Sequence, residues 1–148
     1  MKFSNLKEFK YGWPVVVSAA LGIGLGMSPL PFYTIGVLAG PLNGEFGWRM
    51  DQIMAALPVF TFGALIMGPL IGMITDRVGV RKTTLVSVIL FGLTFIAFSL
   101  NTGSHQLYLF LWALLAITGA GTLPITWTRA VNNWFNENRG LALGLSLL

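Results

Sequence analysis

The distribution of charged residues constrains this chain more than any other feature of its sequence. Its 148 residues include nine Lys or Arg and five Asp or Glu. These charges form four short clusters, separated by charge-free runs of 34, 24 and 46 residues and followed by nine more. Soluble domains carry charge on about a quarter of their residues, and a bilayer core needs roughly 20 apolar residues per spanning helix. The sequence therefore predicts an all-α protein that crosses a membrane several times.

The lengths of these runs set the expected spans. The first two runs predict one helix each, and the 46-residue run must hold two. The polar stretch from Asn101 to Gln106 is expected to form the turn between those two helices. The last apolar segment is too short to cross. The expected spans are about 13–42, 52–75, 83–100 and 107–128, with an incomplete fifth at 140–148.

The basic residues predict the orientation, because loops rich in Lys and Arg stay in the cytoplasm. A cytoplasmic N-terminus leaves only Arg49 outside. The eight residues inside are then Lys2, Lys7, Lys10, Arg77, Arg81, Lys82, Arg129 and Arg139. Residues 1–12 are therefore expected to be a cytoplasmic segment, and 13–148 a partial transmembrane bundle. The expected location is the cell membrane, inner or plasma, as a multi-pass protein.

Composition excludes several classes of function. The chain has no cysteine and one histidine, which excludes disulfides, thiolate or histidine-cluster metal sites and a cysteine nucleophile. The charged clusters lie in loops, so no site gathers the acid, base and nucleophile of an enzyme. The basic residues flank apolar runs and are explained by topology rather than by nucleic acid. No cofactor is expected.

One segment between the second and third expected spans carries a distinctive pattern. It has a glycine, three intervening residues, an acid followed by an arginine, a second glycine and further cations. The residues concerned are Gly72, Asp76, Arg77, Gly79, Arg81 and Lys82. From the residues alone, this segment is a connection of about seven residues with cations on the cytoplasmic side.

This pattern resembles the cytoplasmic signature loop of the major facilitator superfamily, between helices two and three of its N-terminal half. Val80 departs from that pattern, because the basic pair begins one residue later than in many members. A second stretch, from Asn133 to Gly144, resembles the start of helix five in the monocarboxylate and oxalate/formate branch. The segment from Gly12 to Val17 resembles the first helix of that branch.

The resemblance implies the superfamily fold, here as an N-terminal part of four complete helices and the start of a fifth. It implies a secondary active transporter of small solutes, of organic anions such as monocarboxylates, that works by alternating access. A coupling proton or counter-anion is an expected partner, beside the bilayer and the solute. The length then indicates a truncated portion of a longer protein.

The resemblance also implies that Asp76 forms part of a charge lock on the cytoplasmic side. An acid at the membrane edge needs a nearby cation, and Arg77 and Arg129 are both candidates. Arg129, Arg139 and Gly140 are assigned to the cytoplasmic loop before the fifth segment. Gly68 and Gly72 are expected to let another helix approach closely.

A six-residue spacing occurs twice, in the first and fourth expected helices. The two copies are Gly24, Gly26 and Pro29, and Gly119, Gly121 and Pro124. Gly/Pro-interrupted segments in matching positions of inverted repeats point to a transport path. These residues are therefore predicted to form a hinge pair, although glycine and proline are frequent in membrane helices anyway.

Hydroxyl groups near these breaks are the candidate substrate contacts: Tyr33, Thr34, Thr61, Thr118, Thr122 and Thr126. Tyr33 is the first choice, because related exchangers use an aromatic hydroxyl on helix one. The competing role for each threonine is a hydrogen bond to its own helix. No charged residue lies within an expected span, so no intramembrane proton carrier of the usual kind is predicted.

Two other interpretations remain open. The chain is also compatible with an inactive membrane fragment or a packing subunit. Its length fits the small four-helix multidrug exporters, but these need an acid in helix one, and residues 11–44 contain none.

Overall fold

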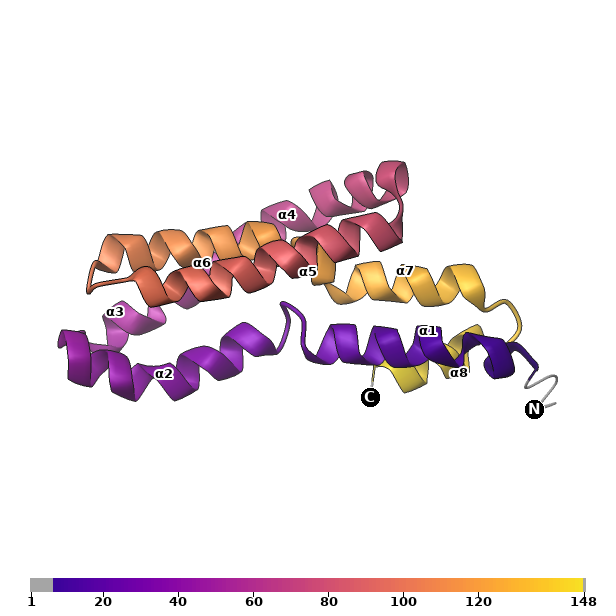
Figure 1. Cartoon of the computed structure of the whole chain (residues 1–148), viewed down its shortest axis with the longest axis horizontal. Helices are drawn as coiled ribbons and strands as arrows, with labels where there is room; N and C mark the ends of the chain where they lie inside the picture. The colour runs from indigo at the N-terminus through magenta and orange to yellow at the C-terminus, as the bar shows by residue number, and fades with distance from the viewer. Residues whose placement is uncertain (1–6, 148) are drawn as a thin grey trace.

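The structure is a computed structural model that describes residues 7–147. Every regular element in this range is a helix, as the sequence predicts. Figure 1 shows an elongated bundle in which α1 (Lys7–Gly24) and α2 (Leu30–Phe46) lie nearly end to end along one side. Along the other side lie α4 (Ala56–Val78), α5 (Val80–Ala97) and α6 (His105–Gly119).

Shorter elements connect and extend these helices. The short helix α3 (Met50–Met54) leads into α4, and two 3-10 turns, η1 (Phe98–Leu100) and η2 (Ala120–Thr122), follow α5 and α6. After η2 the chain continues as α7 (Pro124–Trp134) and ends in α8 (Arg139–Ser146), and both pack against α1.

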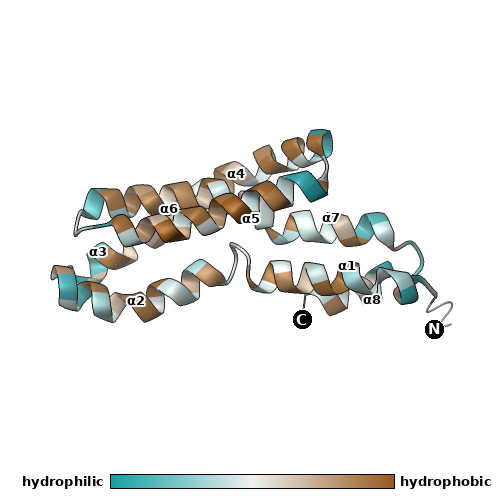
Figure 2. Ribbon diagram, viewed as in Figure 1, coloured by the Kyte–Doolittle hydropathy of each residue, from teal (hydrophilic) through white to brown (hydrophobic). Residues whose placement is uncertain are grey.

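Three helical segments of the described chain are long and apolar enough to cross a membrane. They are Met50–Val78, Val80–Leu100 and His105–Trp134, with 29, 21 and 30 residues. Figure 2 shows that the apolar residues cover their middles, while the hydrophilic residues gather near the ends. This pattern is the one that a hydrocarbon layer between two aqueous phases requires.

The first expected span, 13–42, is wrong as a single helix. The structure divides this run into α1 and α2, which are separated by residues 25–29. Pro29 has no N–H to donate to a preceding turn, and the glycines before it stabilise a helix poorly. Neither α1 nor α2 is among the three segments above.

The charged residues do not mark the ends of the other helices. α4 continues through Asp76 and Arg77 to Val78, and α5 begins at Val80. The expected seven-residue connection is therefore reduced to Gly79. Its backbone has φ 93° and ψ 148°, a conformation that L side chains rarely adopt, so glycine is required at this turn. The charges lie on helical turns that extend beyond the apolar run.

Two separate hydrophobic clusters hold the helices together. One lies among the helices from α2 through α6 and includes Phe60, Tyr108 and Trp112. The other joins α1, α7 and α8 around Val131 and Phe135, which are fully buried. Met27 and Leu123, which lie in the breaks after α1 and α6, pack in the first cluster.

Candidate functional site

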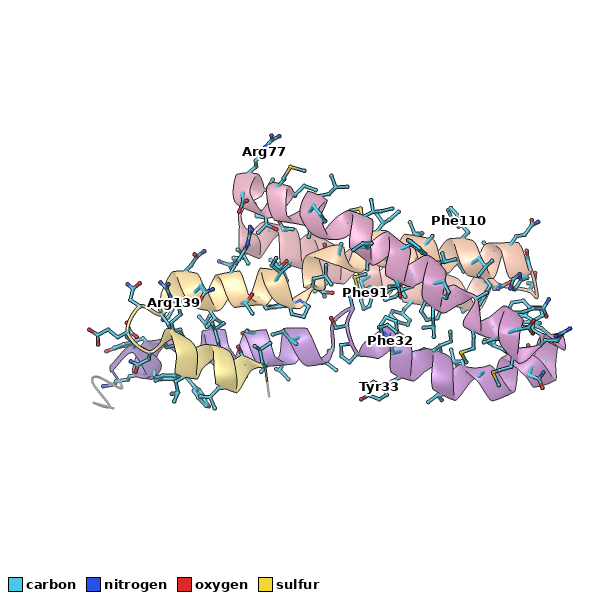
Figure 3. All side chains as sticks on the ribbon, turned by 180° about the vertical axis from the view of Figure 1, so that it is seen from behind. Phe32, Tyr33, Arg77, Phe91, Phe110 and Arg139 are labelled. Carbon is cyan, nitrogen blue, oxygen red and sulfur yellow. The ribbon has the colours of Figure 1, made fainter. Side chains whose placement is uncertain are left out.

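The end of α4 carries the acid of the signature segment beside an arginine of α7. Asp76 Oδ1 forms an ion pair with Arg129 Nη1, which also donates a hydrogen bond to the Gly72 carbonyl at 3.3 Å. Of the two expected partners, the structure therefore selects Arg129. Arg77 points away from the bundle into the surroundings, as Figure 3 shows.

The ion pair lies at the surface, where its contribution to stability is small. The Asp76 side chain is 68% exposed and that of Arg129 is 36% exposed. Exposed pairs contribute about 0–1 kcal/mol. The more informative property is position, because the pair joins two helices that are 53 residues apart in sequence.

A polar depression of about 400 Å³ surrounds this pair. It is lined by Thr75, Asp76, Gly79, Val80, Arg129 and Asn133. Arg81 and Lys82 are exposed on the first turn of α5, so the structure brings together only part of the expected signature set. The sequence did not identify Thr75 or Asn133 as members of this site, because neither carries a charge.

The expected close helix approach at Gly68 and Gly72 is not found among the described residues. A Cβ at Gly68 would meet nothing within 4 Å. A Cβ at Gly72 would lie 3.8 Å from Arg129 Nη2, an ordinary contact. In this part of the chain, Gly72 therefore contributes its carbonyl, which accepts a hydrogen bond from Arg129.

The six candidate substrate contacts do not converge on one cavity. Tyr33 is 77% exposed and points outward from α2 (Figure 3), and Thr61 is exposed on α4. The hydroxyl of Thr34 donates to the Leu30 carbonyl at 2.7 Å, and that of Thr118 donates to the Leu114 carbonyl at 2.9 Å. These two threonines therefore make the hydrogen bonds to their own helices that were the competing expectation.

The two remaining threonines of this set are deeply buried. Thr122 is 2% exposed and Thr126 is 1% exposed. The Thr122 hydroxyl donates to the Gly119 carbonyl at 2.7 Å and accepts from the Met27 N–H at 3.0 Å. Its hydrogen is thus already committed, and no donor remains for an anionic solute.

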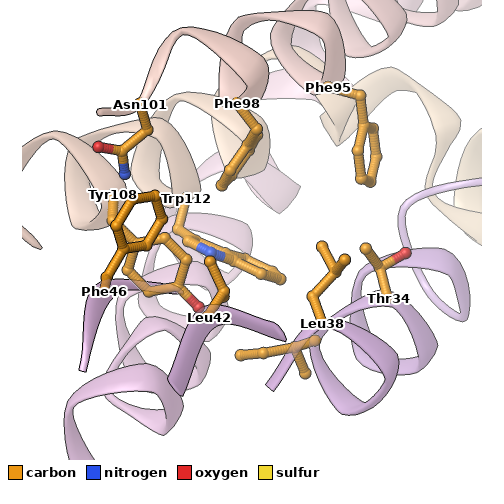
Figure 4. Close-up of a pocket in the computed structure, with 10 residues that line it drawn as sticks. Thr34, Leu38, Leu42, Phe46, Phe95, Phe98, Asn101, Tyr108 and Trp112 are labelled. Carbon is orange, nitrogen blue, oxygen red and sulfur yellow. The ribbon is translucent and has the colours of Figure 1, made fainter. Parts of the chain in front are cut away.

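A small pocket lies between α2, the α5–η1 segment and α6 (Figure 4). Its volume is about 160 Å³, and Thr34 is the member of the candidate set that lines it. Most of its wall is apolar or aromatic, from Leu38, Leu42, Phe46, Phe95, Phe98, Tyr108 and Trp112, with Asn101 as a second polar group. This lining has no charge to balance that of an anion.

The repeated Gly-x-Gly-x-x-Pro spacing coincides with an interruption in both helices. α1 ends at Gly24 and α2 begins at Leu30, while α6 ends at Gly119 and α7 begins at Pro124. Gly26, Gly119 and Gly121 make close approaches, whereas a Cβ at Gly24 would meet nothing within 4 Å. The structure thus brings the two copies together.

One functional-site candidate was missed at the sequence level: Glu8 on the first turn of α1. Its carboxylate accepts hydrogen bonds from the N–H groups of Asn136, Glu137 and Asn138 at 3.3, 3.4 and 3.1 Å, and from the Asn138 side chain at 3.3 Å. The Asn138 N–H has the largest effect on the carboxyl group, and these bonds lower its pKa from the ordinary 4.5. A local sequence pattern cannot predict this contact, because Glu8 and its partners are about 130 residues apart.

Two residues assigned to the cytoplasmic loop follow this contact. Arg139 begins α8, and its Nε donates to the Phe135 carbonyl at 2.9 Å. A Cβ at Gly140 would meet nothing within 4 Å. Arg129, in contrast, lies in α7 and not in the loop.

We expect Glu8→Gln to make the protein less stable at pH 7 and to change its response to acid. A carboxyl group whose pKa is lowered by folding stabilises the fold above its unfolded pKa, and this contribution is lost as pH falls through the lowered value. The difference in unfolding temperature between wild type and Glu8→Gln should therefore narrow below about pH 4.5. The matched control is Glu45→Gln, at an exposed acid of α2. A difference that stays constant from neutral to acid pH would contradict this expectation.

Comparison with known proteins gives one family. The sequence profile described as Major Facilitator Superfamily matches residues 11–148. No solved structure gives a significant match.

Curated relatives carry the same family designation. The uncharacterized MFS-type transporter YfiU of Bacillus subtilis is 28% identical over 123 residues, which cover 83% of this chain and 24% of that protein. The uncharacterized MFS-type transporter YhjX of Escherichia coli is 29% identical over 110 residues, covering 74% and 27%. The MFS-type transporter pynF of Aspergillus niger is 29% identical over 118 residues, covering 78% and 25%. The matched part of the chain thus spans about a quarter of the length of these relatives.

Proposed function

The chain belongs to the major facilitator superfamily, and we propose that it serves secondary active transport of small solutes by alternating access. Its relatives are transporters rather than enzymes, and its apolar helices are those of a multi-pass protein of the plasma membrane. The solute class and the coupling to a proton or counter-anion are part of the proposal.

The ion pair between Asp76 and Arg129 is the observation that carries this proposal. Alternating access requires contacts that form on one side of the membrane in one state and break in the other. A surface pair that contributes little to folding and joins the end of α4 to the middle of α7 suits this task. Gly79 keeps the ends of α4 and α5 close, so that a movement of one helix end is passed directly to the other.

The side of the membrane follows from the basic residues near this pair. Arg77, Arg81, Lys82 and Arg129 all lie at the α4–α5 turn or on α7 close to it. By the bias of basic loops toward the cytoplasm, the proposed lock faces the cytoplasm, as does the segment of residues 1–12.

Small organic anions, such as monocarboxylates, are the proposed solutes. This class rests on the resemblance of residues 12–17 and 133–144 to the organic-anion branch. Tyr33 and Thr61 are the proposed contacts with free hydroxyl groups, because both side chains are exposed and neither is committed to its own helix in the described structure. Their exposed faces are available to helices or solutes beyond the described residues.

The test is uptake by the full-length protein in proteoliposomes. We expect labelled small carboxylates such as lactate, formate or oxalate to accumulate above the level of protein-free vesicles, and an imposed pH or counter-anion gradient to change the rate. Tyr33→Phe should weaken uptake, while Tyr11→Phe, at an exposed tyrosine of α1, should not. Uptake of sugars or drugs, with none of any carboxylate, would overturn the organic-anion assignment.

A further inference from the structure

The interruptions of the two broken helices leave backbone groups without their usual helical partners. Pro29 and Pro124 have no N–H, so neither can bond to the carbonyl four residues earlier. After α6, the Leu123 N–H bonds to the Ala120 carbonyl at 3.2 Å instead of to Gly119. Inside a hydrocarbon layer, a backbone group without a partner is costly because water cannot replace it.

The side chain of Thr122 makes one hydrogen bond in each break. Its hydroxyl donates to the Gly119 carbonyl at 2.7 Å, where the Leu123 N–H would bond in an uninterrupted helix. The same oxygen accepts from the Met27 N–H at 3.0 Å, in the break between α1 and α2. Thr122 and Met27 are 2% and 1% exposed, so both bonds are shielded from solvent.

The small residues around this contact allow the two breaks to meet. A Cβ at Gly26 would lie 2.9 Å from the Thr122 carbonyl oxygen, which is closer than real Cβ atoms tolerate without a shift. A Cβ at Gly119 would lie 2.6 Å from the Phe91 ring and 3.4 Å from Met27 Cβ. The two breaks therefore approach each other closely beside Met27, which belongs to the first hydrophobic cluster.

We propose that Thr122 is a positioning residue whose hydroxyl joins the breaks of α1–α2 and α6–α7 into one joint, so that both helices bend together. The use of this joint in alternating access rests on the proposed transport function, whereas the joint itself does not. The positioning role replaces the expected role of Thr122 as a solute contact. A rigid-body change that bends one broken helix then carries the other with it, and neither break loses its hydrogen bonds.

Amide hydrogen exchange in the full-length protein, reconstituted in lipid nanodiscs, tests the joint. Thr122→Val keeps the shape of the side chain and removes the hydroxyl, so we expect Met27 to exchange about tenfold faster or more. Thr122→Ser keeps the hydroxyl and should restore slow exchange. The matched control is Thr83→Val, because within residues 7–147 the buried Thr83 hydroxyl bonds only to the Gly79 carbonyl of its own turn. This control should leave Met27 unchanged.

A measurement on the wild type keeps the proposal testable if Thr122→Val does not fold. Met27 and Leu123 should show exchange protection within about threefold of each other, because a single joint opens as a unit. Unchanged exchange of Met27 in Thr122→Val, or protection that differs by more than about tenfold between the two breaks, would overturn the joint. Absence of uptake for every solute would instead overturn the transport function, and the exchange results would still decide the joint.

Discussion

Replacing Asp76 with asparagine in the full-length protein is expected to reduce transport by up to about fivefold while membrane insertion stays normal. Asparagine keeps the size of the side chain and removes the charge that pairs with Arg129. A contact present in only one of two states shifts the balance between them by its free energy, and the 0–1 kcal/mol of an exposed pair corresponds to a shift of up to about fivefold. Uptake of the carried solute and the amount of protein in the membrane are the two measurements.

Two further variants separate the proposed lock from a general effect of charge. Asp51→Asn is the matched control, because Asp51 pairs with Arg49 at 3.1 Å within one short segment at the opposite end of the bundle. This variant should transport at the wild-type rate. Arg129→Lys keeps the charge but not the planar guanidinium, whose Nη1 contacts both Asp76 and the Gly72 carbonyl, so it should be impaired less than Asp76→Asn. Wild-type uptake by Asp76→Asn would refute the lock.

The sequence predicted the class of the fold because hydrophobic length is a property that a chain shows without its tertiary contacts. Runs without charge gave the three long helical segments, and the polar residues after Leu100 gave the turn before α6, where Ser104 accepts a hydrogen bond from the Leu107 N–H. The repeated glycine and proline spacing gave the positions of both breaks. Each of these signals lies in one continuous stretch of the chain.

The bounds of the helices were harder to predict, because a charged side chain indicates where the chain reaches water but not where a helix ends. Asp76 and Arg77 lie on the last turns of α4, and Arg129 lies within α7. The single residue that does end α4 is Gly79, whose positive φ turns the backbone. A loop assigned from its charges was therefore several residues too long.

The candidate site could be predicted only in part, because its contacts join segments far apart in sequence. The acid at Asp76 was recognised from its motif, but the choice between Arg77 and Arg129 depends on how α7 packs. Thr122 was chosen because its hydroxyl lies near a break. The structure shows instead that the N–H of Met27, 95 residues away, donates a hydrogen bond to that hydroxyl oxygen. The contact of Glu8 with the segment before α8 has the same origin.

Adding one methyl group at Gly121 is expected to destabilise the protein by about 1–3 kcal/mol, the usual cost of overfilling a packed interior. Gly121 lies in η2, against α5. A Cβ there would lie 2.2 Å from Ser87 Oγ, 2.7 Å from Ser87 Cβ and 3.1 Å from the Thr83 carbonyl. The hydroxyl can rotate away, but Ser87 Cβ and the Thr83 carbonyl move only with the backbone of α5. The expected result of Gly121→Ala is a lower midpoint of denaturant unfolding in nanodiscs.

A double-mutant cycle identifies the cause of this effect. Ser87→Gly removes the two closest atoms, so the pair Ser87→Gly and Gly121→Ala should lose less stability than the sum of the single changes. Gly92→Ala in α5 is the control, because a Cβ at Gly92 would meet nothing within 4 Å, and alanine favours a helix over glycine by about 0.8–1 kcal/mol. It should be as stable as the wild type or more so. Additive losses in the cycle would show that Gly121 is needed for the backbone of the break rather than for the close approach of α5, and would separate the interruption of the helix from its packing.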